Sequence, residues 1–252
     1  MSAFKRYEAA VDRARLLYRI PAAPSGKRIL ELYHSSEPLL RDFDWPGTSQ
    51  TFCRIGQEVE AGSGESPGTV EHAVAQPDFR KPLPFGRASF DLVVVHRTLD
   101  ELASSNIRQG REFDTQPFFK NVLDVLVPGG LVAGCADNRF SLKSLRSQLE
   151  RLKNRARQTS SPGQFTLGSL HKALTVAGFA DARLFTLLPN GSAPFKLIDT
   201  EPAISRAAFR HELQIARQLT STPGYLLRRL AVELGLYRQL EESIFFWAYK
   251  PC

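Results

Sequence analysis

The segment Phe90–His96 (FDLVVVH) constrains the fold most, because it is a near-continuous apolar run rich in β-branched residues. Such a run is typical of a strand that is buried on both faces of a parallel sheet. Residues 117–127 then repeat apolar positions at helical spacing. We expect the Pro-Gly-Gly at 128–130 to stop that helix and lead into a second apolar strand, Leu131–Cys135. Strand, helix and strand in this order predict a parallel, right-handed crossover.

The rest of the chain alternates short apolar segments with amphipathic ones, which predicts a single three-layer α/β domain over residues 1–252. Gly178 is expected to end one helix, because glycine tolerates the positive φ of a helix C′ position. Three additions to the sheet are expected: a leading helix within 1–25, a basic helical insert at 139–165 and a helical insert at 191–240 before the last strand. The other strands are predicted near residues 29–33, 51–59, 70–74, 182–188 and 244–249, and the other helices near 4–19, 166–178, 203–219 and 225–239.

Composition excludes several classes of protein. A hydrophobic fraction of 42% in 252 residues is ordinary for a globular chain and argues against a mostly disordered one. The charged amino-terminal segment has no apolar core of a secretory signal, and no apolar run approaches the roughly 20 residues that span a bilayer. The three cysteines, Cys53, Cys135 and Cys252, have neither metal-ligand nor disulfide spacing. We therefore expect a cytoplasmic protein with no metal site.

Much of the formal charge of +7 comes from one stretch, residues 139–157, which carries seven Lys or Arg against the single acid Glu150. Its leucines recur at helical spacing, so the basic residues would gather on the opposite face. Such a face could meet an acidic protein partner or an anionic surface. The alternative is a solvated helix face with no partner.

Three segments resemble class I, S-adenosylmethionine-dependent methyltransferases of the type 11-like group. They are PLPFGRASFDLVVVHRTLDEL at 82–102, FFKNVLDVLVPGGLVAGCADN at 118–138 and FTLGSLHKALTVAGFADARLF at 165–185. The resemblance implies a Rossmann-like, three-layer α/β sandwich with a mostly parallel seven-stranded sheet and helical insertions. It also implies S-adenosylmethionine as the cofactor, if the protein is active.

The chain departs from this family where the cofactor would bind. The family pattern has an acid followed by a glycine-rich loop, because glycine lets the backbone turn tightly and approach the ligand. Here the segment reads Glu31-Leu32-Tyr33-His34-Ser35-Ser36-Glu37, so the acid remains but all three glycines are replaced. Glu31, Tyr33, His34 and Ser35 are the cofactor-binding positions that the resemblance implies. Tyr33 and His34 could instead plug an empty site.

Three further residues are candidates for the site. Glu58 is the best placed acid to grip the ribose after the second strand, although a solvated loop acid is the alternative. Asp78 lies where the family often has an acid near the adenine, or it is a turn aspartate after Pro77. His96 follows the buried strand and could act as a general base, line the pocket or belong to a structural turn.

Two functions remain open at this stage. The first is a methyltransferase-like pseudo-enzyme with lost or weakened S-adenosylmethionine binding, which serves as a binding or assembly partner. The second is an active methyltransferase on a small molecule or glycan intermediate of bacterial cell-envelope biosynthesis. The basic insert, AGFADARLFTLLPN at 177–190 and the helical segment before SIFFWAY at 243–249 are in combination similar to methyltransferase-like proteins of bacterial glycan and cell-envelope clusters. Nucleic acid is not expected as a partner, because the basic residues lack interleaved aromatics.

Overall fold

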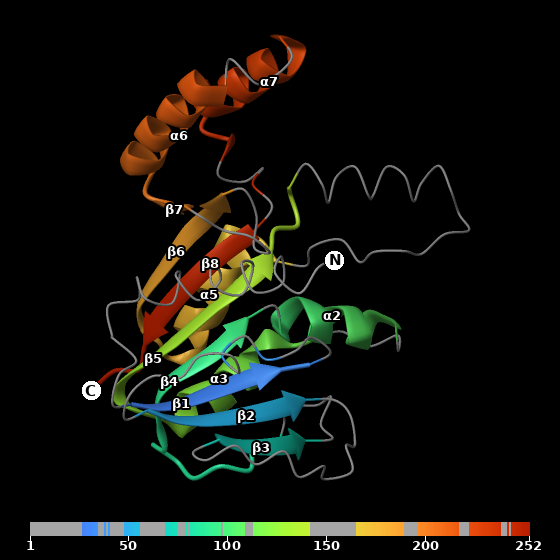
Figure 1. Ribbon diagram of the computed structural model, residues 1–252, viewed down its shortest axis with the longest axis vertical. Coiled ribbons are helices and arrows are strands. Elements are labelled where there is room, and N and C mark those ends of the chain that lie inside the picture. Colours follow the sequence, from blue (N-terminus) through green and yellow to red (C-terminus); the bar gives the residue numbers. More distant parts are fainter. Residues whose placement is uncertain are drawn as a thin grey trace.

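In the part of the chain that the structure describes, eight strands form one sheet, and helices pack on it or extend beyond it (Figure 1). The computed structural model describes residues 27–34, 38, 40, 48–55, 69–74, 79, 81–96, 98–108, 113–141, 165–188, 196–216, 222–237, 241 and 243–252. Its elements are β1 Arg28–Tyr33, β2 Ser49–Ile55, β3 Thr69–Val74, β4 Phe90–His96, α2 Thr98–Arg108, α3 Thr115–Val125, β5 Leu126–Asp137, α5 Leu167–Ala177, β6 Ala180–Leu188, β7 Lys196–Asp199, α6 Pro202–Ala216, α7 Thr222–Glu233 and β8 Ser243–Tyr249.

The strands lie in the order β3-β2-β1-β4-β5-β8-β6-β7. The first five are parallel to one another, whereas β8 runs antiparallel between β5 and β6. The mostly parallel sheet of the Rossmann-like α/β fold is thus confirmed. The chain builds outward from β1 to β3 and then returns to place β4 on the other side of β1, so the strand order reverses between β1 and β4.

One strand was not predicted. β7 pairs antiparallel with β6 and lies in the segment 191–240, for which we expected helices alone. Its four residues are too few for a period-two pattern to stand out from the sequence. The two helices expected in the same segment are present as α6 and α7.

The two faces of the sheet bury different apolar sets because side chains alternate along each strand. Leu30 and Leu32 of β1 point to the face that α2, α3 and α5 cover, while Ile29 and Tyr33 point to the opposite face. Aromatic residues of α3 form part of the first core, where the rings of Phe119 and Phe246 meet edge to face at 6.0 Å. The helices thus cover one face of the sheet and pack against its side chains.

Local signals at the helix ends are confirmed. Gly178 follows α5 with φ of 102°, in the left-handed region that glycine favours. Asp100 and Glu101 lie in the first turn of α2, where a carboxylate is favourable beside the free backbone N–H groups. The expected leading helix and residues 142–157 of the basic stretch lie outside the described residues.

The Pro-Gly-Gly segment was expected to form a turn before the strand, but it is part of the strand. α3 ends at Val125, and β5 begins at Leu126 and includes all three residues. The Gly129 N–H donates to the Lys250 carbonyl at 3.0 Å, and the Lys250 N–H donates to the Gly130 carbonyl at 2.8 Å. The backbone after β8 therefore holds this segment in the sheet, a long-range contact that local sequence does not reveal.

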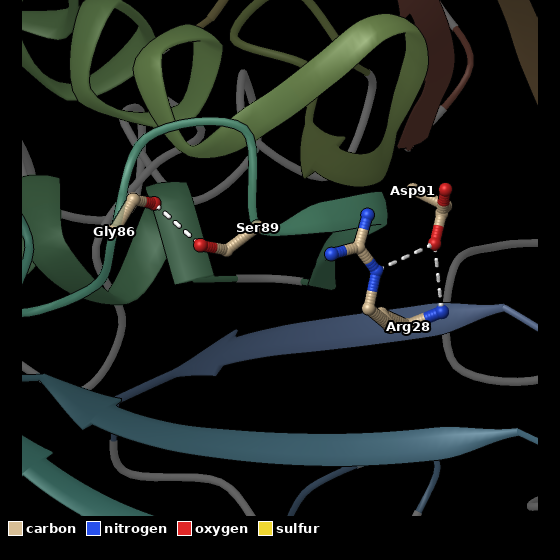
Figure 2. Close-up of polar contacts among 4 residues, drawn as sticks. All are labelled: Arg28, Gly86, Ser89 and Asp91. Carbon is tan, nitrogen blue, oxygen red and sulfur yellow. Dashed lines mark hydrogen bonds and ion pairs between the residues drawn. The ribbon is translucent and has the colours of Figure 1, made fainter.

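At the opposite end of the sheet from the strand exits, Arg28 joins β1 to β4. Its backbone N–H and its Nε both donate to Oδ2 of Asp91, at 2.9 and 3.2 Å (Figure 2). Asp91 follows a turn in which the Ser89 hydroxyl donates to the Gly86 carbonyl (Figure 2). Partial burial opposes ionisation of Asp91, but the two hydrogen bonds and the charge of Arg28 outweigh it and lower the pKa of the carboxyl group.

Asp91→Asn tests this link. Because the folded pKa lies below the ordinary value of 3.8, the stabilisation is complete above that value and is lost as the pH falls through the folded pKa. At neutral pH the variant should be less stable by about 0.2–1 kcal/mol, since the pair is partly exposed. Urea unfolding measured from neutral to acid pH should show the difference vanish at the acid end. A difference that stays constant with pH would contradict this account.

Gly134 in β5 lies where the sheet leaves no room for a side chain. A Cβ there would lie against Val95 Cγ2, 2.7 Å from Phe246 Cζ and 2.9 Å from the Val95 carbonyl oxygen. Gly134→Ala should therefore destabilise the protein by about 1–3 kcal/mol in urea unfolding, as overpacked cores do. Gly168→Ala is the control, because no atom lies within 4 Å of its added Cβ and alanine favours a helix. Equal effects of the two substitutions would refute the close packing at Gly134.

Candidate functional site

The carboxyl ends of β1 and β4 form the candidate site. In open α/β sheets a ligand binds in the crevice outside the strand ends where the strand order reverses. That point lies between β1 and β4 here, as Figure 1 shows.

Glu31 of β1 is buried, with 2% of its surface exposed. Its carboxylate oxygen Oε2 accepts a hydrogen bond from the backbone N–H of Leu40 at 2.8 Å. A buried carboxylate needs such partners, because losing its hydration is costly. The acid that the family pattern places before the glycine loop is therefore engaged by the chain that follows the strand.

Tyr33 ends β1 and shares the face of Glu31, since the two are separated by one residue in a strand. It is 4% exposed and belongs to the apolar cluster of the second face, with Leu40, Phe52 and Leu92. Where the family pattern has its first glycine, this protein has a buried aromatic ring. The Tyr33 side chain therefore contributes to the apolar core on this face of the sheet.

His34, the next residue, is half-buried, and its carbonyl oxygen accepts a hydrogen bond from Arg54 Nε at 3.3 Å. Arg54 lies beside Tyr33 in the register of β1 and β2. The end of β2 thus holds the backbone that leaves β1. Arg54 was not among the residues expected at the site.

β4 and α2 contribute a second set of contacts. The buried Thr98 hydroxyl donates to the Leu32 carbonyl of β1 at 2.5 Å. Asp100 Oδ2 accepts the backbone N–H of Asp137, at the end of β5, at 2.8 Å. The start of α2 therefore ties together the carboxyl ends of β1 and β5. Thr98 was not among the residues expected at the site.

Asn138 follows β5 at the same edge and is 1% exposed. Its Nδ2 donates to the Glu241 carbonyl at 2.9 Å, and its Oδ1 accepts the Phe140 N–H at 3.2 Å. It joins the end of β5 to the segment before β8. Its position directly after an apolar strand, at the edge where ligands bind, was a signal that could have identified it.

The remaining predicted site residues are placed in part or not at all. His96 ends β4 and pairs with Cys135 of β5, but its side chain is outside what the structure describes. Ser35, Glu58 and Asp78 lie outside the described residues. Of the predicted set, the structure brings together Glu31, Tyr33 and His34 at the exit of β1.

Cys53, in β2, has a buried thiol. Burial raises the pKa of the Cys53 thiol to about 12, so it stays protonated and unreactive near neutral pH. No group of three or more metal-ligating side chains occurs in the part of the chain that the structure describes. Within the same part, no helix is both long and apolar enough to cross a membrane.

The fold is similar to that of several solved structures. A methyltransferase from Thermotoga maritima, described as a possible histamine N-methyltransferase, has a TM-score of 0.53 at 12% identity, with 97% of this chain and 90% of that chain covered. Phosphoethanolamine N-methyltransferase 2 of Haemonchus contortus, in complex with S-adenosyl-L-methionine, has a TM-score of 0.51 at 16% identity. This match covers 96% of the present chain but only 53% of the Haemonchus chain.

A third similar structure is named for a different activity. The cyclase SpnF has a TM-score of 0.50 at 16% identity, over 95% of this chain and 81% of its own. No protein-family model matches the sequence, and no curated protein sequence matches it. At these identities the similarity defines the fold, so the function must be argued from the site.

Glu31 offers a direct test of the contacts at the exit of β1. Glu31→Ala removes the acceptor for the buried Leu40 N–H and should destabilise the protein by about 1–3 kcal/mol. Glu31→Gln keeps an oxygen acceptor without the charge and should cost less. Urea unfolding of both variants gives the comparison. Two equal losses of stability would mean that the hydrogen bond to Leu40 is not what Glu31 contributes.

Proposed function

We propose that this protein is a pseudo-enzyme with the fold of class I, S-adenosylmethionine-dependent methyltransferases. Its cofactor binding is lost or weakened, and it serves as a binding or assembly partner. The burial of Tyr33 at the position of the first family glycine carries this proposal. A cofactor cradle needs backbone that a ligand can approach closely, and a tyrosine side chain packed at that backbone opposes such an approach.

The hydrogen bond of Glu31 supports the same conclusion. In the family pattern this acid faces the cofactor loop, whereas here its carboxylate holds the Leu40 N–H within the protein. A ligand that recruited Glu31 would have to displace a buried hydrogen bond, which costs free energy that the ligand must supply. The described residues at the exit of β1 therefore fit an internal packing role better than a cofactor cradle.

An active methyltransferase is the second candidate, and Glu31 itself favours it. The acid of the family pattern is retained near the end of β1, beside the point where the strand order reverses. In that case the acceptor would be a small molecule or a glycan intermediate of bacterial cell-envelope synthesis, and His96 would lie at the strand end as a candidate base. Methyl transfer depends mainly on positioning the two reactants, so it requires no fixed set of catalytic residues.

A role without methyl transfer is compatible with this architecture. The same sheet and helices can host different activities, because activity depends on the residues at the strand ends. The basic stretch 139–157 is a candidate surface for the partner, since its charge suits an acidic protein or an anionic surface. We place this role in the cytoplasm.

Titration of the full-length protein with S-adenosylhomocysteine by calorimetry tests the proposal. We expect no binding up to about a millimolar of ligand. Thermal unfolding in the presence of the ligand should likewise show no shift, because only binding to the folded state raises the melting temperature. Binding in the micromolar range would overturn the pseudo-enzyme proposal and favour the active methyltransferase.

Substituting glycine at the three replaced positions tests whether the loop alone prevents binding of S-adenosylhomocysteine. The triple variant Tyr33→Gly, Ser35→Gly, Glu37→Gly should bind the ligand if the rest of the site is intact. Because loss of the buried ring leaves a cavity that can cost about 3–5 kcal/mol, folding of the variant must be verified first. Tyr33→Phe is the matched control, since it keeps the ring and should remain unable to bind.

A further inference from the structure

α6, α7 and β7, which we call the arm, have a small hydrophobic core of their own. Figure 1 shows α6 and α7 extending away from the sheet, at the top of the view. The Ser205 hydroxyl and the Tyr237 hydroxyl share a buried hydrogen bond of 2.6 Å within this core. The buried apolar residues of the arm are Ile198, Phe209, Leu213, Ala231, Val232 and Tyr237.

The arm also exposes apolar side chains to solvent. Of the eight large apolar residues that are exposed in the described part of the chain, five belong to the arm or follow α7 directly. Three of them, Leu226, Leu230 and Leu234, are 55–61% exposed and recur every four residues; we call them the leucine stripe. Clustered exposure of this kind marks an interaction site more often than scattered single residues do.

The leucine stripe lies on the side of α7 that faces away from the core of the arm. Residues four apart share one side of a helix, and the Leu234 N–H donates to the Leu230 carbonyl at 2.9 Å, so the helical repeat continues to Leu234. Ala231 and Val232, which are buried against α6, point to the other side of α7. α7 thus has two apolar sides, and the packing of the arm uses one of them.

Arginines border the leucine stripe. Arg210 pairs with Glu233 of α7 through hydrogen bonds of 2.7 and 3.3 Å, and this contact is the main cause of the lowered pKa of Glu233. The charges of Arg206 and Arg229 lower it further, so the positive charge of three arginines acts on one carboxylate. Residues 202–237 contain five arginines and two acids. The border of the stripe is therefore positive.

We propose that the leucine stripe of α7 docks on an anionic phospholipid surface, independently of whether the protein binds S-adenosylmethionine. A helix that lies in a membrane interface inserts its apolar side to the level of the acyl chains and keeps its basic residues at the lipid phosphates. The stripe supplies the apolar contacts. Arg206 and Arg229 supply cations at its border, and Arg210 neutralises Glu233, which would otherwise be repelled.

Charge and residue type distinguish this partner from others. A second copy of the chain would bring two positively charged arms together, and like charges across an interface are unfavourable. Protein interfaces depend mostly on Trp, Tyr and Arg, with Leu under-represented among the residues that carry the binding energy. Where burial is described, the large exposed apolar residues of the arm are leucines and one isoleucine, Ile204. A fluid lipid surface needs no shape-matched pocket for them.

Co-sedimentation of the full-length protein with vesicles tests the proposal. The vesicles contain phosphatidylcholine alone or phosphatidylcholine with about one-third phosphatidylglycerol, which carries the negative charge. We expect binding to the anionic vesicles that weakens as ionic strength rises, because salt screens the arginine–phosphate attraction. Leu230→Gln with Leu234→Gln should weaken binding about tenfold or more, since two leucine side chains lose their burial in lipid.

Ile107→Gln with Val176→Gln is the matched control, because these residues are 50% and 54% exposed but belong to α2 and α5. The control should bind vesicles as the native protein does, and circular dichroism should show both double variants folded. Failure of the native protein to bind anionic vesicles, equal binding to neutral vesicles, or equal losses in the two double variants would overturn the proposal. So would a dimer in light scattering that the stripe variant converts to monomer.

Discussion

The buried hydrogen bond between the Glu31 carboxylate and the Leu40 N–H determines how the chain leaves β1. It brings the backbone back to the sheet nine residues after the acid, so that Leu40 packs in the same apolar cluster as Tyr33. Around it, Thr98 holds the Leu32 carbonyl and Arg54 holds the His34 carbonyl. The edge where this fold offers a ligand site is therefore cross-linked by the protein itself.

Under our proposal, the protein keeps the scaffold of this fold without its usual cofactor binding. The strand order depends on apolar packing and on backbone pairing, neither of which needs the glycine loop. A cofactor site depends on a few positions at the end of one strand, and those positions can change while the sheet persists. Tyr33 illustrates this, since a residue that opposes a close ligand approach adds apolar burial to the core.

The sheet and its fold were predictable from the sequence. The signals were the apolar run of β4, the helix before Gly178 and the resemblance over residues 82–185. Prediction failed where the cause was a contact far along the chain. The Pro-Gly-Gly segment joins β5 because Lys250, far along the chain, holds it. β7 was missed for a different reason, since its four residues are too few for an alternating pattern to stand out. At the site, the replaced glycines were evident from the sequence. The bond from Thr98 to Leu32 and the burial of Asn138 were not, since each depends on how separate strands meet.

We propose that the protein's own side chains occupy the exit of β1 and leave no room there for a cofactor. A crystal structure of the full-length protein grown with a saturating amount of S-adenosylhomocysteine tests it most directly. The account predicts that Tyr33 keeps its place in the apolar cluster, that Glu31 still accepts the Leu40 N–H, and that no ligand density appears at the end of β1. Ordered S-adenosylhomocysteine at that edge, with Tyr33 displaced or Glu31 turned to the ligand, would contradict it.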